Sequence, residues 1–226
     1  MSELPEILLI DKPIGITSFD VIRQLRKKTG IKKFGHAGTL DPLASGLMIL
    51  GVEKGTKKLT EFIKLDKEYI AEIRIGESRT TGDLEGEIIE KVETVVLDEE
   101  SVKAAVEALV GNLVLPVSAY SAIKKDGKPM YKRAREAEKV GELVKDVPFR
   151  EMVVHQAELL GVEMINIKNE ERVVVKVRFF VGSGTYIRSL AEELGRRLSY
   201  PATLQALRRT KIGNFNIEEA LDLDNI

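Results

Sequence analysis

Apolar and polar positions alternate along several stretches of the chain, which predicts strands. The clearest case is residues 67–75, Lys-Glu-Tyr-Ile-Ala-Glu-Ile-Arg-Ile, where every second residue is apolar or aromatic, as in a half-buried strand. Continuous apolar runs and further alternating stretches predict additional strands at 6–11, 47–52, near Ile88, and at 151–167, 172–181 and 203–212.

Helical spacing of apolar residues separates these strands. Thr17-Ser18-Phe19-Asp20 resembles a capping box and opens an amphipathic helix that we expect to end near Gly30. Further helices are predicted at 56–62, from the cap Asp98 to Val110, at 128–140, and from Thr185 onward. The mixture predicts an α+β fold with a mixed, mostly antiparallel central sheet flanked by helices and loops. We expect a single catalytic domain over 1–226, with a peripheral lobe around 76–150.

Composition excludes several kinds of chemistry. The 226 residues are 43% hydrophobic and 31% charged, values typical of a soluble globular protein. No apolar run is long enough for a membrane span and no signal sequence opens the chain, so we expect a cytoplasmic protein without a membrane partner. There is no cysteine, and the two histidines, His36 and His155, are far apart in sequence. We therefore expect no metal and no cofactor.

Charge is strongly segregated although the net charge is only −1. Positive side chains gather in three segments, and an RNA backbone would bind a face of this kind. The alternative is that each segment is simply a solvated helix or turn. The segments comprise Arg23, Arg26, Lys27, Lys28, Lys32 and Lys33; Lys124, Lys125, Lys128, Lys132, Arg133 and Arg135; and Arg208, Arg209 and Lys211.

Asp41 lies in a glycine-rich loop, Gly35-His36-Ala37-Gly38-Thr39-Leu40-Asp41-Pro42-Leu43-Ala44-Ser45-Gly46. Pro42 disfavours helical geometry at Asp41, and the glycines permit close approach of a ligand. A carboxylate on such a loop is a candidate acid, base or nucleophile. The local residues equally allow a turn or cap role, because Asp-Pro commonly initiates turns. His36 is a buried loop histidine, a proton carrier or a ring inserted among bases.

Three other features are ordinary when taken alone. Tyr69 sits in the alternating strand, where an aromatic usually packs in a sheet. Arg188 falls just inside a helix, where an exposed ion pair is the usual interpretation. Gly182-Ser183-Gly184 precedes that helix but lacks the Gly-Lys-Ser/Thr ending of a P-loop, and no dinucleotide-binding fingerprint is present.

Taken together, these segments resemble the ordered motifs of the tRNA pseudouridine-55 synthases, the TruB family. The resemblance begins with Ile10-Asp11-Lys12-Pro13-Ile14-Gly15-Ile16-Thr17-Ser18 and the Asp41 loop, and spans roughly residues 6–213. It continues through Lys67-Glu68-Tyr69, Thr80-Thr81-Gly82-Asp83-Leu84-Glu85-Gly86, Pro116 with Tyr120-Ser121-Ala122-Ile123-Lys124, Gly127 and Tyr131, Gly184-Thr185-Tyr186-Ile187-Arg188-Ser189-Leu190, and Leu207-Arg208-Arg209.

The resemblance implies a role for each matching residue. Asp41 would be the essential aspartate, Tyr69 the aromatic beside the target base, and Arg188 the partner of the aspartate. His36 would fill the space left by extruded nucleotides, Leu207 would pack near the uracil, and Lys12 would stabilise the centre of the site. The other substrate-binding residues implied by these motifs are Gly38, Thr39, Tyr186 and Lys124.

The implied activity is isomerisation of the T-loop uridine, position 55 of tRNA, on a flipped-out nucleotide. The implied partner is the T-arm of tRNA, and we expect a monomer. Two alternatives remain: a non-catalytic RNA-binding or RNA-folding module on the same fold, and a synthase acting on another RNA site. Family members commonly continue into a C-terminal RNA-binding domain of the PUA type, whereas this sequence stops at Ile226; we expect no such domain here.

Overall fold

In the computed structural model, which describes residues 4–121, 123–142, 144, 146–167 and 170–225, the chain divides into two units. The first comprises Met1–Ile70, Phe179–Gly184 and Ala206–Ile226, and the second comprises Ala71–Arg178 and Thr185–Gln205. Strands β4 (Lys67–Ile75), β11 (Glu170–Val181) and β12 (Ala202–Ile212) run from one unit into the other. Ala122, one residue of the family-like motifs, lies outside the described residues.

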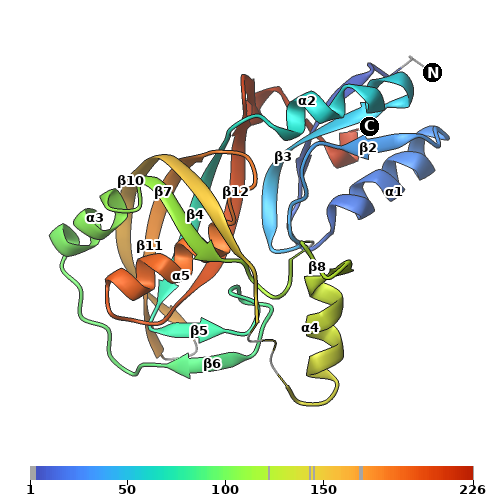
Figure 1. The fold of residues 1–226 in the computed structure, drawn as a ribbon. Coiled ribbons are helices and arrows are strands. Elements are labelled where there is room, and N and C mark those ends of the chain that lie inside the picture. Colours follow the sequence, from blue (N-terminus) through green and yellow to red (C-terminus); the bar gives the residue numbers. More distant parts are fainter. Residues whose placement is uncertain (1–3, 122, 143, 145, 168–169, 226) are drawn as a thin grey trace. The chain divides into compact units, whose positions relative to one another are not determined.

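The first unit is built on strands in the order β14-β1-β3-β12-β4. Strand β1 (Ile7–Lys12) is antiparallel to β3 (Ala44–Val52), and β3 runs parallel to the end of β12. Helix α1 and helix α2 lie on opposite faces of this sheet (Figure 1). The remaining elements are α1 (Ser18–Thr29), β2 (Phe34–His36), η1 (Glu53–Lys57), α2 (Leu59–Ile63), β13 (Phe215–Asn216), η2 (Ile217–Glu219), β14 (Leu221–Asp222) and η3 (Leu223–Asn225).

Alternation along the strands explains why both faces are covered. On β3, Leu47 and Ile49 are completely buried in a cluster with Leu59 of α2. Met48 and Leu50 are equally buried and point to the opposite face, since successive side chains of a strand alternate. A strand buried on both faces reads as the continuous apolar run that predicted it.

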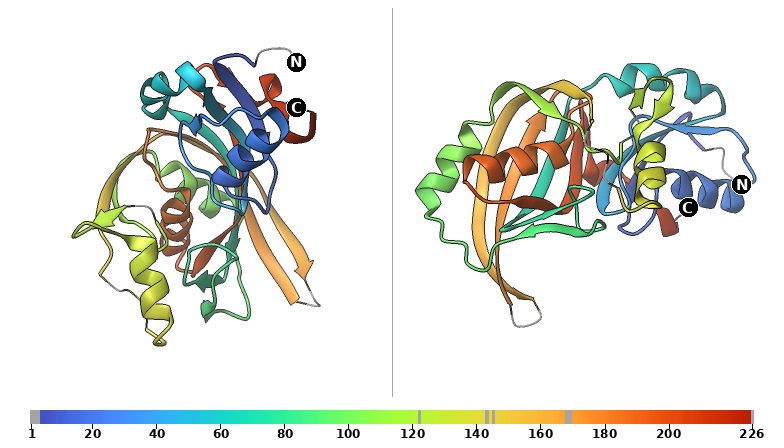
Figure 2. Two further views of the ribbon diagram at one scale, coloured as in Figure 1. Left: turned by 90° about the vertical axis from the view of Figure 1, so that its right-hand side faces the viewer. Right: turned by 60° about the horizontal axis from the view of Figure 1, so that its bottom comes forward.

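The second unit contains the strand order β4-β11-β10-β7, with β7 antiparallel to β10. Helix α3 packs against β10 and helix α5 against β7. The hairpins β5–β6 and β8–β9 form separate two-stranded sheets (Figure 2). Its other elements are β5 (Glu77–Arg79), β6 (Ile88–Lys91), α3 (Glu99–Glu107), β7 (Gly111–Pro116), β8 (Lys124–Lys125), β9 (Lys128–Pro129), α4 (Met130–Glu138), β10 (Phe149–Ile167) and α5 (Ile187–Arg197).

The predicted α+β class with a mostly antiparallel sheet is confirmed, because only β1–β14 and β3–β12 are parallel among the strand pairs described by register. The capping box of α1 is also confirmed: Thr17 and Asp20 satisfy each other's backbone amides, and Gly30 ends the helix with φ +76°. Two helix starts are wrong by two residues. Lys128 and Pro129 form β9 instead of the start of α4, and α5 begins at Ile187 with Tyr186 as its N-cap.

Gly46 lets β12 approach the strand that follows the Asp41 loop. It adopts φ +108°, and a Cβ there would lie 2.3 Å from the carbonyl oxygen of Arg209. Because the obstructing atoms belong to backbone, Gly46→Ala is expected to lower the free energy of unfolding by about 3 kcal/mol. Urea denaturation measures this. Gly30→Ala is the matched control, since Gly30 has φ +76° with open space around it and should lose only about 1 kcal/mol. Equal losses at the two positions would contradict the steric explanation.

Candidate active site

Asp41 lies between β2 and β3 in the first unit, half-buried on a loop that is fixed on both sides. On one side, Ser18 Oγ accepts from the amide of Leu40 (2.8 Å) and donates to its carbonyl (3.1 Å). On the other, the amide of Gly15 donates to the carbonyl of Pro42 (2.8 Å). The backbone that carries the carboxylate is therefore held by the segment that leads into α1.

Lys12 supports the same segment. Its side chain is fully buried, and Nζ donates to the carbonyls of Pro13 (2.9 Å) and Ile16 (2.8 Å). Charge-assisted bonds of this kind are among the stronger hydrogen bonds in proteins. Lys12 thus fixes the turn whose Gly15 amide donates to the carbonyl of Pro42.

Arg209 is a residue whose importance the sequence analysis missed. It was assigned to an exposed basic segment, which is wrong: only 1% of it is exposed. Its Nε donates to the carbonyl of Leu47 (2.7 Å) and its Nη2 to that of Gly38 (3.3 Å), so it ties the Asp41 loop to β3. The neighbouring Arg208 binds the carboxylate of Asp11 (2.6 Å). The signal available in sequence was position, since both arginines fall within a strand that crosses a buried sheet.

Strand pairing places further predicted residues near this loop. Leu207 of β12 is the register partner of Ala44, three residues after Asp41. Tyr69 lies on β4, the next strand after β12 in the sheet, and only 8% of it is exposed. Gly38 has φ +103° at the turn of the loop, and Thr39 is exposed beside it. Within the first unit, strand pairing therefore places Leu207 at the start of β3 and Tyr69 on the strand beyond β12.

His36 ends β2 at the edge of the same loop, and its environment favours the neutral ring. Burial lowers the pKa of His36 below its ordinary value of 6.5, and the positive charge of Arg209 lowers it further. Unfolded chains bind the His36 proton more readily, so the free energy of unfolding should fall as pH drops through 6.5. NMR titration of the ring should give a pKa below 6.5. A pKa at or above 6.5 would contradict the inference that burial and Arg209 disfavour the charged ring.

Arg188 belongs to the second unit, where two other motifs of the sequence converge on it. Only 6% of the residue is exposed. Its Nη1 donates to the carbonyl of Thr81 (2.9 Å) and to Ser118 Oγ (3.3 Å), and its Nη2 donates to the carbonyl of Tyr120 (3.2 Å). The expectation of an exposed ion pair at Arg188 is wrong.

Asp83 is one acid that pairs with Arg188, and the sequence analysis did not single it out. Its Oδ2 lies 3.5 Å from Arg188 Nη1, and 2% of the residue is exposed. Asp83 Oδ1 accepts from Thr81 Oγ1 (2.6 Å) and from the amide of Glu85 (3.1 Å). Glu192, one turn after Arg188, completes the charged group: burial raises its pKa, and the charge of Arg188 opposes that rise.

The other two predicted residues of the second unit are less enclosed. Tyr186 is the half-buried N-cap of α5, two residues before Arg188. Lys124 is exposed on β8, where it pairs with Pro129 of β9. The same hairpin leads into α4, whose Tyr131 ring lies 5.9 Å from the guanidinium carbon of Arg135.

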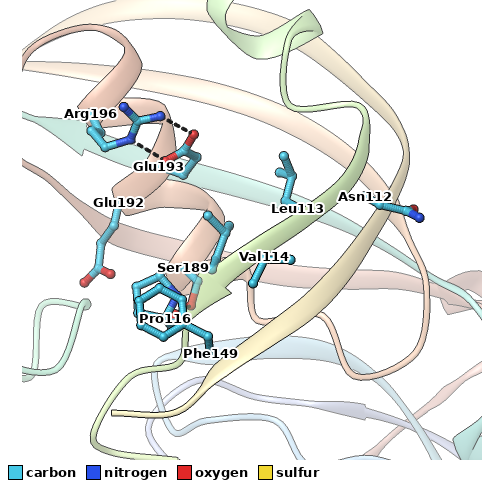
Figure 3. Close-up of a pocket in the computed structure, with 10 residues that line it drawn as sticks. Asn112, Leu113, Val114, Pro116, Phe149, Ser189, Glu192, Glu193 and Arg196 are labelled. Atoms are coloured by element: carbon cyan, nitrogen blue, oxygen red, sulfur yellow. Dashed lines mark hydrogen bonds and ion pairs between the residues drawn. The ribbon is translucent and has the colours of Figure 1, made fainter. Parts of the chain in front are cut away.

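A groove of about 470 Å³ runs between β7 and α5 in the second unit (Figure 3). It contains none of the predicted site residues, although Ser189 and Glu192 of α5 line it together with Val114 and Phe149. Glu193 and Arg196 form an ion pair at its edge (2.7 Å). The groove is therefore not the place where the predicted site residues lie.

Within the ranges that the structure describes, no group of three or more histidine, aspartate or glutamate side chains is arranged to hold a metal ion. Within those same ranges, every helix is too short or too polar to cross a membrane.

Residues 26–187 match the model of a family described as TruB family pseudouridylate synthase (N terminal domain). A protein of Leifsonia xyli subsp. xyli named tRNA pseudouridine synthase B is 42% identical over 220 residues, covering 96% of this chain and 70% of the relative. One of Thermobifida fusca with the same name is 40% identical, covering 97% and 73%.

Solved structures agree on the fold. A chain from the structure of an H/ACA RNP bound to a substrate RNA containing 2'-deoxyuridine matches with a TM-score of 0.68 at 25% identity. A chain from a Cbf5-Nop10-Gar1 complex matches with a TM-score of 0.70 at 24% identity. Each match covers 96% of this chain, which spans about half the length of those solved chains.

Proposed function

The chain belongs to the TruB family of pseudouridylate synthases, and from that premise we propose that it converts the uridine at position 55 in the T-loop of tRNA to pseudouridine, with Asp41 as the catalytic carboxylate. One observation carries the choice of Asp41. It is a half-buried carboxylate on a loop whose two sides are fixed by Ser18 and Gly15. Catalytic groups held in advance in this way lose little freedom on the path to the transition state.

The proposed reaction requires a carboxylate but no change of oxidation state that would call for a cofactor. The N1–C1′ bond of uridine breaks, the freed uracil rotates, and a C5–C1′ bond forms; C5 then loses its hydrogen as a proton, and N1, which carried none in uridine, gains one. Nothing is oxidised or hydrolysed. An aspartate can attack C1′, attack C6 of the uracil, or remove the 2′ proton by way of a glycal. Each route requires Asp41 in its ionised form.

The remaining residues of the first unit receive roles that fit their surroundings. Tyr69, on a strand near Leu207, is assigned to stack on the uracil and to handle the proton at C5, while Leu207 packs against the ring. His36 occupies the space of the flipped nucleotide; its lowered pKa supports this, since a neutral imidazole stacks among bases without burying a charge. Gly38 and Thr39 bind the RNA along the loop, and Lys12 keeps the loop in place.

From the second unit, the proposal assigns Arg188 to balance the charge of the catalytic aspartate. Its fixed guanidinium, held by three carbonyl or hydroxyl oxygens and by Asp83, supports that role because orientation is set before substrate arrives. Tyr186 and the exposed Lys124 are assigned to the RNA. The partner is the T-arm of tRNA, on which the chain acts as a monomer, as one catalytic domain.

Site-resolved mapping in vitro tests this function. A tRNA transcript without modifications is incubated with the protein, and pseudouridine is located by chemical adduct formation and primer extension. We expect one new pseudouridine, at position 55, and none in a matched transcript carrying cytidine there. Conversion at another uridine would replace the proposed target, and binding of tRNA without any product would favour a non-catalytic RNA-binding module.

A further inference from the structure

Helix α1 carries an exposed stripe whose composition is unusual for a solvated helix face. Ser18, Val21, Ile22 and Leu25 are buried against the first unit. On the opposite side the residues at positions i, i+4, i+7 and i+8 are Phe19, Arg23, Arg26 and Lys27. All four are exposed, Phe19 to 55%.

The stripe begins at the Asp41 loop. Ser18, the first residue of α1, makes both hydrogen bonds with Leu40, and the preceding turn binds Pro42 through Gly15. That turn also exposes Ile14, to 66%. From this anchored end the helix extends for twelve residues, or about 18 Å. Its far end is followed by Lys32 and Lys33, both exposed.

This surface carries more positive side chains than are paired with acids or carbonyls of the protein. Asp20 is the one acid of α1, and it is engaged by Thr17 and Arg23. Lys28 donates to the carbonyl of Leu223 (2.7 Å). Among the described residues, no hydrogen-bond or ion-pair partner is found for the side chains of Lys27, Lys32 and Lys33. Attraction to the helix dipole accounts for cations in the last turn, but not for lysines beyond the helix end.

The aromatic end of the stripe also suits a nucleic acid. The guanidinium carbon of Arg26, two turns further along the helix, lies 5.8 Å from the centre of the Phe19 ring. Planar aromatic and guanidinium groups are the surfaces on which unpaired RNA bases stack, and lysines beside them bind phosphates. An anionic protein surface would match the lysines but would leave Phe19 and Ile14 without a partner.

We propose that this α1 surface, defined by Ile14, Phe19, Arg23, Arg26, Lys27, Lys32 and Lys33, binds the RNA strand that leads into the target nucleotide, with its sugar-phosphate backbone along the lysines. The inference rests on the proposed function, since it takes the Asp41 loop as the place where the nucleotide is received. It adds an RNA interface on the first unit that does not depend on the basic segment carried by β8, β9 and α4 of the second unit.

The test measures binding of a T-arm hairpin of tRNA to the whole chain as salt is varied. K27Q/K32Q/K33Q is expected to weaken binding about tenfold near 0.1 M salt and to reduce the slope of log affinity against log salt by about 2, because three phosphate contacts are lost. The matched control is K54Q/K57Q/K64Q, which removes three exposed lysines from η1 and the C-cap of α2 in the same unit and should change neither value.

A second variant, K32Q/K33Q, leaves the helix itself untouched and should retain about two thirds of the effect on slope. Equal losses in the α1 and control variants, or unchanged affinity and slope in both α1 variants, would overturn the proposed surface. Conversion of the hairpin uridine by the unaltered protein is measured in parallel. If that conversion occurs, a negative binding result refutes only the surface; if it does not, the proposed function itself fails.

Discussion

Asp41→Asn should abolish conversion of the T-loop uridine, lowering the single-turnover rate by at least about 10⁴-fold, while binding of the tRNA changes less than about threefold. The asparagine keeps the size and the turn-forming ability of the side chain but can neither attack a carbon nor accept a proton. Because Leu40 and Pro42 are fixed through backbone and Ser18 contacts, the loop should keep its conformation.

Asp222→Asn provides the comparison for this loss. Asp222 is an exposed aspartate of the same unit whose Oδ2 accepts a weak bond from Asn225 (3.3 Å), so its amide variant should turn over normally. Ordinary turnover by Asp41→Asn would remove the carboxylate from the mechanism. A parallel loss of RNA binding would instead assign Asp41 a structural role in the loop.

Arg188→Lys should lower the rate by about 10²- to 10³-fold, the size expected when one preorganised charge-stabilising group is lost. Lysine retains the charge, but a single ammonium cannot reach the Thr81 carbonyl, Ser118 and the Tyr120 carbonyl in the geometry of a planar fork. Asp83→Asn should show a smaller loss of the same kind, since it removes the acid that orients Arg188.

The effects of substituting Arg188 or Asp83 on stability have to be separated from their effects on the reaction rate. Removing the charge altogether, as in Arg188→Met, leaves Asp83 buried without its cation and should cost about 3 to 5 kcal/mol of unfolding free energy. Arg74→Lys is the control: Arg74 is similarly buried, bound to Gln205 Oε1 (2.9 Å) and near Glu77, yet has no assigned role. It should lose stability without a matching loss in rate. Equal rate losses for Arg74→Lys and Arg188→Lys would show that Arg188 acts through folding alone.

Local rules predicted much of the fold. The α1 helix was delimited correctly because its signals are local: a reciprocal cap at Thr17 and Asp20, and a left-handed glycine at position 30. Strand β7 was missed because Gly111–Pro116 is short, and its apolar run of Leu113, Val114 and Leu115 is too brief to mark a strand by itself. Its strand conformation depends on pairing with β10, which lies far along the sequence.

The candidate site residues likewise divide into those with signals in the nearby sequence and those defined by distant contacts. Asp41 could be singled out only through the resemblance, because an Asp-Pro in a glycine-rich loop has an equally good structural explanation. Arg209 and Asp83 were missed because their partners are distant in sequence: Gly38 and Leu47 for the arginine, and Arg188 for the aspartate. Charge counting assigned Arg209 to a surface, whereas its burial follows from the strand that carries it.

The most direct test of the central claim is pseudouridine mapping in tRNA from cells that lack the gene and from the same cells complemented with the unaltered chain or with Asp41→Asn. The account predicts that uridine 55 remains unmodified without the gene, is converted when the unaltered chain is supplied, and stays unmodified with the asparagine variant. Full modification of position 55 without the gene, or its restoration by Asp41→Asn, would contradict the account.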